Sequence, residues 1–219
     1  MKYLSPYEKR VRRARRWWLL VFIIAVFVII SVFDKPLVYL FHIDLSRDIT
    51  HFDLYKLFRI MGYWGTWIAI GCIYIIHDRN RHRGLALILA PLFAGLVAEF
   101  IKLVVARERP VDGTDIQSGL YHFRGLFTGF EDATNLGFPS SHAAVAFAGC
   151  LMLACYLSQA RNALLLMAIG CAITRMLTGS HFASDVYVGA LLGWGSASMM
   201  CHFASIYVPE LRPRYRRPL

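Results

Sequence analysis

Charged residues are scarce in this chain of 219 residues, of which 17% are Asp, Glu, Lys or Arg and 57% are hydrophobic. An apolar excess of this size, with a mean hydropathy of +0.47, excludes an ordinary soluble domain. The formal net charge is +10, but the basic residues gather between apolar runs instead of lining solvent-facing elements. Nucleic-acid binding is therefore not indicated. The composition predicts a membrane protein.

Cysteine frameworks, linkers and cleavage signals are also missing. The five cysteines all lie inside apolar runs, as small buried hydrophobic residues do, and do not indicate disulfides or a zinc site. No internal repeat, low-complexity tract or Pro/Gly-rich linker divides the sequence. Basic residues precede the first apolar run, but no small-residue cleavage site follows it, so we expect that run to stay as an anchor. We therefore expect one domain, residues 1–219, with no metal and no cofactor.

Six apolar stretches are long enough to cross a bilayer, because about 20 helical residues cover a hydrocarbon core about 30 Å thick. The predicted fold class is an all-α membrane protein with six transmembrane helices. Residues 49–60 carry apolar side chains at helical spacing, which fits an interfacial helix before the second span and equally well a solvated loop with a helical end. The six spans are predicted at Trp17–Phe33, Leu57–Ile76, Gly84–Ala106, His142–Ser158, Asn162–Leu177 and Val186–Val208.

The distribution of basic residues sets the predicted orientation, since Lys and Arg accumulate in short cytoplasmic loops. With the N-terminus inside, the inner segments hold 15 Lys and Arg and three acidic residues. The outer segments hold six Lys and Arg and ten acidic residues. Both termini are therefore predicted to be cytoplasmic, and the loop 107–141 is predicted to lie outside.

The first polar group beside a span runs from Lys102 through Arg109 to Pro110. Ionisable residues within spans cost about 2.5–3.5 kcal/mol each at the helix centre, so those present invite a functional interpretation. Lys102 and Arg109 are seven residues apart, hence two turns apart on one helical face, and Pro110 favours the end of the helix. Both cations are expected to reach one place. Taken alone, a lysine near a span end more often extends its ammonium group to the interface.

The second group, Phe138-Pro139-Ser140-Ser141-His142, opens the fourth predicted span. A serine before an apolar helical run is an N-cap signal, and a helix N-terminus with free amides is suited to hold an anion. A capping serine beside an uninvolved histidine explains this group equally well when it is considered alone.

The third group contains Thr174, Arg175, His181 and Asp185, and it joins the fifth and sixth predicted spans. Its histidine and aspartate are four residues apart, which places them about one helical turn from each other. A carboxylate at that position can hold one imidazole nitrogen and leave the other free for nucleophilic attack.

The predicted spans place all three groups at the outer leaflet. Three cations, two imidazoles and one carboxylate at one membrane level would repel strongly in an empty site, so a polyanionic ligand is required. Phosphate meets this requirement. Phosphoryl transfer needs in-line placement of nucleophile and leaving group, together with positive charge around the equatorial oxygens. Three fixed cations supply that charge without magnesium.

Together, the three groups resemble the signature motifs of the type 2 phosphatidic acid phosphatase superfamily in order, spacing and six-span layout. The resemblance covers about residues 85–190. Two positions depart from the family pattern: Ser141 stands where glycine is usual, which narrows the room beside the phosphate, and Thr174 stands where serine is usual. Neither change removes a proton donor or a charge. The matching motifs are Lys102-x6-Arg109-Pro110, Pro139-Ser-Ser-His142 and Arg175-x5-His181-x3-Asp185.

The resemblance implies a role for each matching residue. His181 would be the nucleophile that forms a phosphohistidine, and Asp185 would orient it and stabilise its charge. His142 would protonate the leaving alkoxide and then activate water. The residues implied to bind the phosphoryl oxygens are Lys102, Arg109, Arg175, Ser140 and Ser141.

Four other ionisable residues near the motifs are expected to have minor roles. Glu99 is expected to pair with Lys102, chiefly as a structural partner. His122 and Arg124 are expected to lie on the outer loop without a function, a headgroup contact being the alternative. Arg59 is expected to extend outward or to belong to the interfacial helix.

The sequence therefore predicts a metal-independent lipid phosphatase whose substrate keeps its tail in the bilayer. The tail stays open between diacylglycerol, polyprenyl and lipid A, as does the choice of monophosphate or pyrophosphate. Short loops and small size resemble bacterial members, which favours a bacterial inner membrane with the site facing the periplasm. The expected partners are the bilayer and a phosphorylated lipid, with the oligomeric state left open. The alternatives are a lipid phosphotransferase with an alcohol acceptor, a vanadate-dependent haloperoxidase, which six apolar spans argue against, and a non-enzymatic anion transporter.

Overall fold

The computed structural model describes residues 6–41, 50–78, 80–110 and 123–207. Within these ranges the regular elements are helices, accompanied by two isolated β-bridges. The predicted all-α class is confirmed. In chain order the elements are α1 (Pro6–Phe41), α3 (Asp53–Ile60), α4 (Trp64–His77), α5 (Arg81–Val105), η1 (Thr128–Phe130), α6 (Ser141–Tyr156), η2 (Ser158–Ala160), α7 (Arg161–Leu177) and α8 (Ala183–Tyr207).

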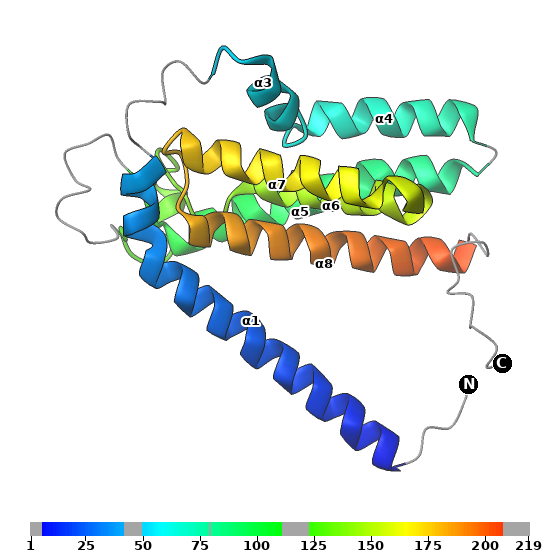
Figure 1. The fold of residues 1–219 in the computed structure, drawn as a ribbon, viewed down its shortest axis with the longest axis horizontal. Helices are drawn as coiled ribbons and strands as arrows, with labels where there is room; N and C mark the ends of the chain where they lie inside the picture. The colour runs from blue at the N-terminus through cyan, green and yellow to red at the C-terminus, as the bar shows by residue number, and fades with distance from the viewer. Residues whose placement is uncertain (1–5, 42–49, 79, 111–122, 208–219) are drawn as a thin grey trace.

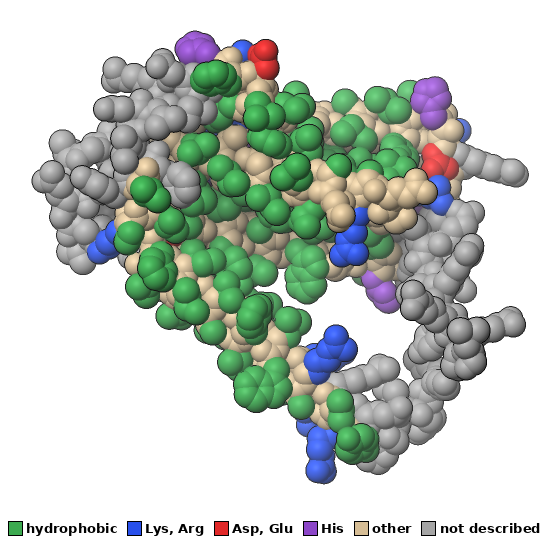
Figure 2. Space-filling view, in the orientation of Figure 1, with side chains coloured by type: hydrophobic (Ala, Val, Ile, Leu, Met, Phe, Trp, Pro, Cys, Tyr) green, Lys and Arg blue, Asp and Glu red, His purple; other side chains and the backbone are tan. Residues whose placement is uncertain are grey.

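Several helices are long and apolar enough to cross a membrane. Among the described residues three segments qualify, Arg13–Val38, Arg81–Val105 and Ser158–Leu177, and the bent pair of α3 and α4 makes a fourth if it forms one span. Helix α6 is apolar but has only 16 residues. Figure 2 shows hydrophobic side chains along α1 and over the visible face of the bundle, as expected for a surface in contact with lipid. The number of spans and the side of the termini stay predictions.

The second predicted span differs from the structure at its start. Residues 57–60 belong to the separate helix α3, which is bent by 68° from α4, so a helix does precede the second span. Packing fixes the break between them: a Cβ at Gly62 would lie 2.9 Å from the ring of His142 and 3.0 Å from the sulfur of Cys171. Glycine therefore lets the chain pass close to α6 and α7. The backbone at Gly62, between α3 and α4, therefore packs against His142 of the second motif.

Helix α6 lies at the centre of the bundle and packs against α5, α7 and α8. Ten of its 16 residues are buried, and six of those ten are Ala or Gly. Small side chains let neighbouring helices approach closely. Gly189 and Gly193 of α8 complete the contact, because a Cβ at either position would collide with a backbone oxygen of Ser140 or Ala144. This close packing fixes the N-terminal end of α6.

One end of the bundle collects the segments that carry the three motifs. There α5 ends, α6 begins and a short turn joins α7 to α8 (Figure 1). The C-terminal part of α1 reaches the same end and packs against α8, while the rest of α1 diverges from the bundle (Figure 1). The fold thus brings residues far apart in the sequence to one end.

Candidate active site

The start of α6 carries the second motif. Ser140 has extended backbone angles and its hydroxyl accepts a hydrogen bond from the Ala143 amide at 3.5 Å, so the predicted N-cap is present. The amide of Ser140 donates to the backbone oxygen of Asp185 at 3.0 Å. This bond joins the second motif to the third and places the free end of α6 beside the α7–α8 turn.

Lys102, in the last turn of α5, points into the bundle and is only 6% exposed. Its ammonium group donates to a Glu99 carboxylate oxygen at 2.7 Å and to the Ser141 hydroxyl at 3.0 Å. The predicted pairing with Glu99 is confirmed, and the lysine side chain is buried within the bundle. Ser141, which stands where the family usually has glycine, therefore adds a hydrogen-bonding group to the site.

Arg109 reaches the site by a different path from the one the sequence predicted. The helical stripe from Lys102 to Arg109 does not exist, because α5 ends at Val105 and Ala106 turns into the left-handed region with φ of 50°. Arg109 then follows on an extended segment, and its Nε donates to the backbone oxygen of Leu136 at 3.1 Å. Its charge nevertheless acts on both Lys102 and Arg175. Arg109 therefore lies near the other two cations as expected, but the segment after α5 places it there and not the helix itself.

The third motif is buried at the α7–α8 turn. Arg175 lies in the last turn of α7, and His181 and Asp185 are almost fully buried. The His181 Nδ1 lies 3.7 Å from an Asp185 carboxylate oxygen, which is an ion-pair distance and longer than a hydrogen bond. The Phe182 amide holds that same oxygen at 2.9 Å. Burial lowers the pKa of the His181 imidazole and the Asp185 charge opposes this shift.

His142 connects the three motifs electrostatically. It lies in the first turn of α6, half-buried, and the charges of Arg175, Lys102 and His181 all act on it. Its ring and that of Tyr63 form a T-shaped pair, with 5.2 Å between ring centroids. The structure therefore brings the predicted histidines, cations and carboxylate into one cluster.

The buried nitrogens of this cluster that have no hydrogen-bond partner among the described residues include Arg175 Nε, His142 Nε2 and His181 Nδ1. Buried polar groups almost always have partners, so unpartnered donors at one place indicate a ligand that accepts hydrogen bonds. With Lys102 and Arg109 beside them, the arrangement is chemically suited to a tetrahedral oxyanion.

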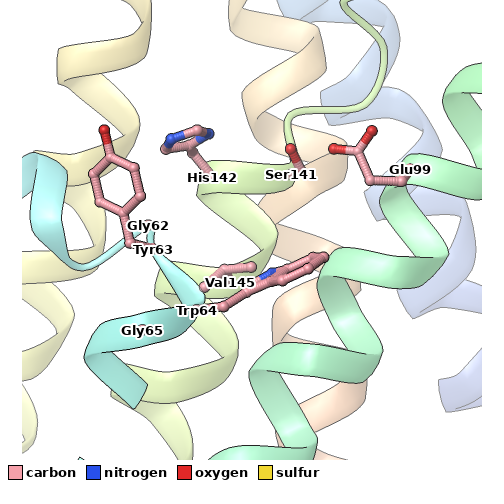
Figure 3. Close-up of a pocket in the computed structure, with 8 residues that line it drawn as sticks. All are labelled: Gly62, Tyr63, Trp64, Gly65, Glu99, Ser141, His142 and Val145. Atoms are coloured by element: carbon pink, nitrogen blue, oxygen red, sulfur yellow. The ribbon is translucent and has the colours of Figure 1, made fainter. Parts of the chain in front are cut away.

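A cavity of about 370 Å³ opens beside the cluster, between α4, α5 and the start of α6. Figure 3 shows the Ser141, His142 and Glu99 side chains on one side of it, with Trp64 and Val145 on another. The cavity therefore combines polar groups next to His142 with an apolar wall. The residues that line it are Gly62, Tyr63, Trp64, Gly65, Glu99, Ser141, His142 and Val145.

Arg59 belongs to α3, the helix before the second span, which agrees with one of the two expectations for this residue. Its side chain is directed toward the cluster. Its guanidinium carbon lies 5.9 Å and 5.7 Å from the ring centroids of Tyr55 and Tyr63. Its charge acts on His142 and Arg175. In the sequence, the position of Arg59 just before an interrupted apolar run could have indicated a role at the site.

One residue of the loop between α5 and α6, Arg124, and one of the first motif, Arg107, have contacts that the sequence did not indicate. Arg124 forms ion pairs with Glu108 at 2.6 Å and Asp132 at 2.7 Å, so it ties the loop to the first motif and is not a bystander. Arg107, inside the first motif, is buried against Asp34 and Asp185. Its position between Lys102 and Arg109 was the signal. His122 lies outside the described residues.

Comparisons with known proteins agree on one family. A family model described as the PAP2 superfamily matches residues 83–208, which is more than half of the chain. Two curated relatives are named lipid A 1-phosphatase: one from Rhizobium etli is 33% identical over 114 residues (52% of this chain and 47% of the relative), and one from Rhizobium johnstonii is 31% identical over 122 residues (55% and 48%). The chain spans about half the length of these relatives. No solved structure matches it.

Proposed function

Because this chain belongs to the PAP2 superfamily, we propose that it is a membrane phosphatase that hydrolyses a phosphate monoester or pyrophosphate of a lipid, with His181 as the nucleophile. The observation that carries the proposal is the cluster of Lys102, Arg109 and Arg175 around two histidines, with unpartnered buried donors among them. Such a cluster supplies fixed positive charge to the three equatorial oxygens of a transferring phosphoryl group.

The first step transfers the phosphoryl group to the protein. The His181 Nε2 attacks phosphorus while the bond from phosphorus to the lipid oxygen breaks. His142 gives a proton to the departing oxygen, which leaves as an alcohol from a monoester or as a lipid monophosphate from a pyrophosphate. Asp185, 3.7 Å from the His181 Nδ1, stabilises the positive charge that the imidazole gains.

The second step releases phosphate. His142, now neutral, takes a proton from a water molecule, and the resulting hydroxide attacks phosphorus as the bond to His181 breaks. Inorganic phosphate leaves and His181 returns to its neutral state. Lys102 and Ser141, joined at 3.0 Å, are placed to hold phosphoryl oxygens through both steps, and the proposal needs no metal ion.

The proposed substrate reaches this site from the bilayer. We place six spans in the membrane with both termini in the cytoplasm, which puts the cluster at the outer, periplasmic face of a bacterial inner membrane. The cavity beside His142 has an apolar wall at Trp64 and Val145, which suits the lipid part of the substrate. The two relatives named lipid A 1-phosphatase favour a lipid A type of substrate over the other tails.

A panel assay tests the proposal. Purified protein in detergent is given phosphatidate, a polyprenyl pyrophosphate and lipid A, and inorganic phosphate is measured without any added alcohol, which separates a hydrolase from a phosphotransferase. We expect phosphate release from at least one lipid, and its loss in the folded His181→Ala variant. We also expect His142→Ala to accumulate an acid-labile phosphoenzyme that His181→Ala lacks. Turnover retained by folded His181→Ala would contradict the role of that histidine.

A further inference from the structure

A chain of buried charges leads from α1 to the proposed nucleophile. Asp34 lies near the C-terminal end of α1 and is 0% exposed, and Arg107 follows the end of α5 and is 4% exposed. Burying an ion pair is costly unless its geometry and hydrogen bonds are nearly complete. The hydrogen bonds that Ser184 makes with Asp34 and Arg107 offset the cost of burying this ion pair.

Asp34 is held on both carboxylate oxygens by the start of α8. One oxygen accepts the Ser184 amide at 2.8 Å, and the other accepts the Ser184 hydroxyl. The second oxygen also lies 3.2 Å from an Arg107 terminal nitrogen. Asp34 thus anchors the residue immediately before Asp185, although 150 residues separate it from Ser184 in the chain.

Arg107 lies between two carboxylates. One terminal nitrogen contacts Asp34, and the other lies 3.2 Å from an Asp185 oxygen and 2.9 Å from the Ser184 hydroxyl. The guanidinium also stacks over Phe182, 4.4 Å from its ring centroid. A planar guanidinium can contact two acceptors at fixed angles, which a lysine ammonium cannot reproduce.

Resting on the proposed function, we propose that Asp34 and Arg107 are positioning residues for the phosphoryl transfer. Arg107 fixes one oxygen of Asp185, so that the other faces His181. Asp34 shares the charge of Arg107, which leaves Asp185 enough negative charge to stabilise the imidazolium of the phosphohistidine. Neither residue touches the phosphoryl group.

The geometry of α1 supports a specific role for Asp34. Most of the apolar side chains of α1 are exposed, and the helix diverges from the bundle along much of its length (Figure 1). The fully buried carboxylate is therefore placed where α1 meets the site, not where the helix contributes a large apolar core. A first helix that served only as a membrane anchor would not need this carboxylate.

Asp34→Asn is the most informative variant, because it keeps the shape and the acceptor oxygen for Ser184 but removes the charge. We expect kcat to fall about 10–100-fold, the loss typical of residues that orient metal-ligating histidines, while KM stays within about twofold because phosphate contacts are intact. The matched control is Asp53→Asn, which removes an exposed carboxylate of α3 and is expected to leave both constants unchanged.

The pH profile separates positioning from a merely structural role. The charged groups that face His181 are Asp185 of α8, Arg175 of α7, Lys102 of α5 and His142 of α6. In Asp34→Asn, more of the Arg107 charge acts on Asp185, so cationic His181 is less stabilised and its pKa falls. The nucleophile must be neutral, so the acid limb of the kcat/KM profile should move to lower pH. A variant that only loosens the fold would lower the plateau without moving that limb.

The outcomes are distinguishable from failure of the proposed function. If the unmodified protein releases no phosphate from any lipid, the proposed function fails. If it does, and folded Asp34→Asn has its kcat and acid limb unchanged, the positioning role is overturned. If Asp34→Asn does not accumulate as a folded protein, Arg107→Lys decides: a kcat at least tenfold lower with KM unchanged supports the role, and a kcat equal to that of the unmodified protein refutes it.

Discussion

Two arginines of the site, Arg175 and Arg109, are held by different means. Arg175 lies in the last turn of α7, so the packing of that helix sets its place. Arg109 follows the left-handed Ala106 on an extended segment, pinned by its backbone bond to Asn135 and its side-chain bond to Leu136. A side chain on a packed helix stays in position as long as the bundle is folded. A side chain on a loop is held in position by a few polar contacts. We therefore expect changes near helix-borne groups to remove catalysis, and changes near loop-borne groups to weaken binding gradually.

Removing the helix-borne Arg175 should have the largest effect. Arg175→Ala is expected to lower kcat/KM by about 10²–10³-fold, the usual loss when one preorganised donor to a developing charge is removed. Steady-state phosphate release measures it, with Arg161→Ala at the opposite end of α7 as the control. A folded Arg175→Ala variant within threefold of the unmodified protein would show that this arginine does not meet the phosphoryl group.

Moving a helix-borne histidine without removing it should have the next largest effect. In Gly62→Ala the added Cβ would lie 2.9 Å from the His142 ring and displace it. We expect kcat to fall about 10–100-fold, since a shift of about 1 Å in a reacting group can cost that much. Gly195→Ala is the control, because a Cβ there meets nothing within 4 Å. Equal losses in the two variants would mean that the break between α3 and α4 does not position His142.

Loosening the loop should have a smaller effect, on binding. Arg124→Gln removes the ion pairs to Glu108 and Asp132 that tie the loop to the first motif. These pairs are partly exposed and screened by solvent, so we expect KM to rise only about fivefold with kcat within twofold. Inhibition by orthophosphate should weaken in parallel. A fall in kcat at unchanged KM would contradict the idea that this segment contributes to binding through Arg109.

Replacing Glu99 should have the smallest effect, and this change should improve substrate binding where the others impair the enzyme. Its half-exposed carboxylate lies 2.7 Å from the Lys102 ammonium and competes with phosphate for it. Glu99→Gln should therefore lower KM for an anionic substrate by about threefold, because a like charge beside the phosphate is removed. Titration with orthophosphate as a competitive inhibitor measures the same change. A higher KM would instead show that Glu99 is needed to hold Lys102 in place.

The part of the site that could be predicted from the sequence is the part set by local pattern. A serine N-cap was predicted from its place before an apolar run, and Lys102, His142 and Asp185 were identified as ionisable side chains at span ends. The left-handed turn at Ala106 has no such signal, since alanine rarely adopts that conformation and only tertiary contacts impose it.

Contacts between distant segments of the bundle could not be predicted from the sequence either. Asp34 and Ser184 are 150 residues apart, and nothing in either local pattern links them. The break at Gly62 depends on its closeness to His142 and Cys171, which belong to other helices. Helix class and motif order follow from hydropathy and spacing, whereas loop paths and long-range charge pairs follow from packing that one sequence does not reveal.

The most direct test of the account is a structure of the protein bound to orthovanadate, a tetrahedral oxyanion that mimics the transferring phosphoryl group. We predict vanadium bonded to the His181 Nε2, its equatorial oxygens contacted by Lys102, Arg109 and Arg175, and His142 on the opposite side. Vanadate bound elsewhere, or those cations directed away from it, would contradict the claim that three distant segments form one phosphoryl-transfer site.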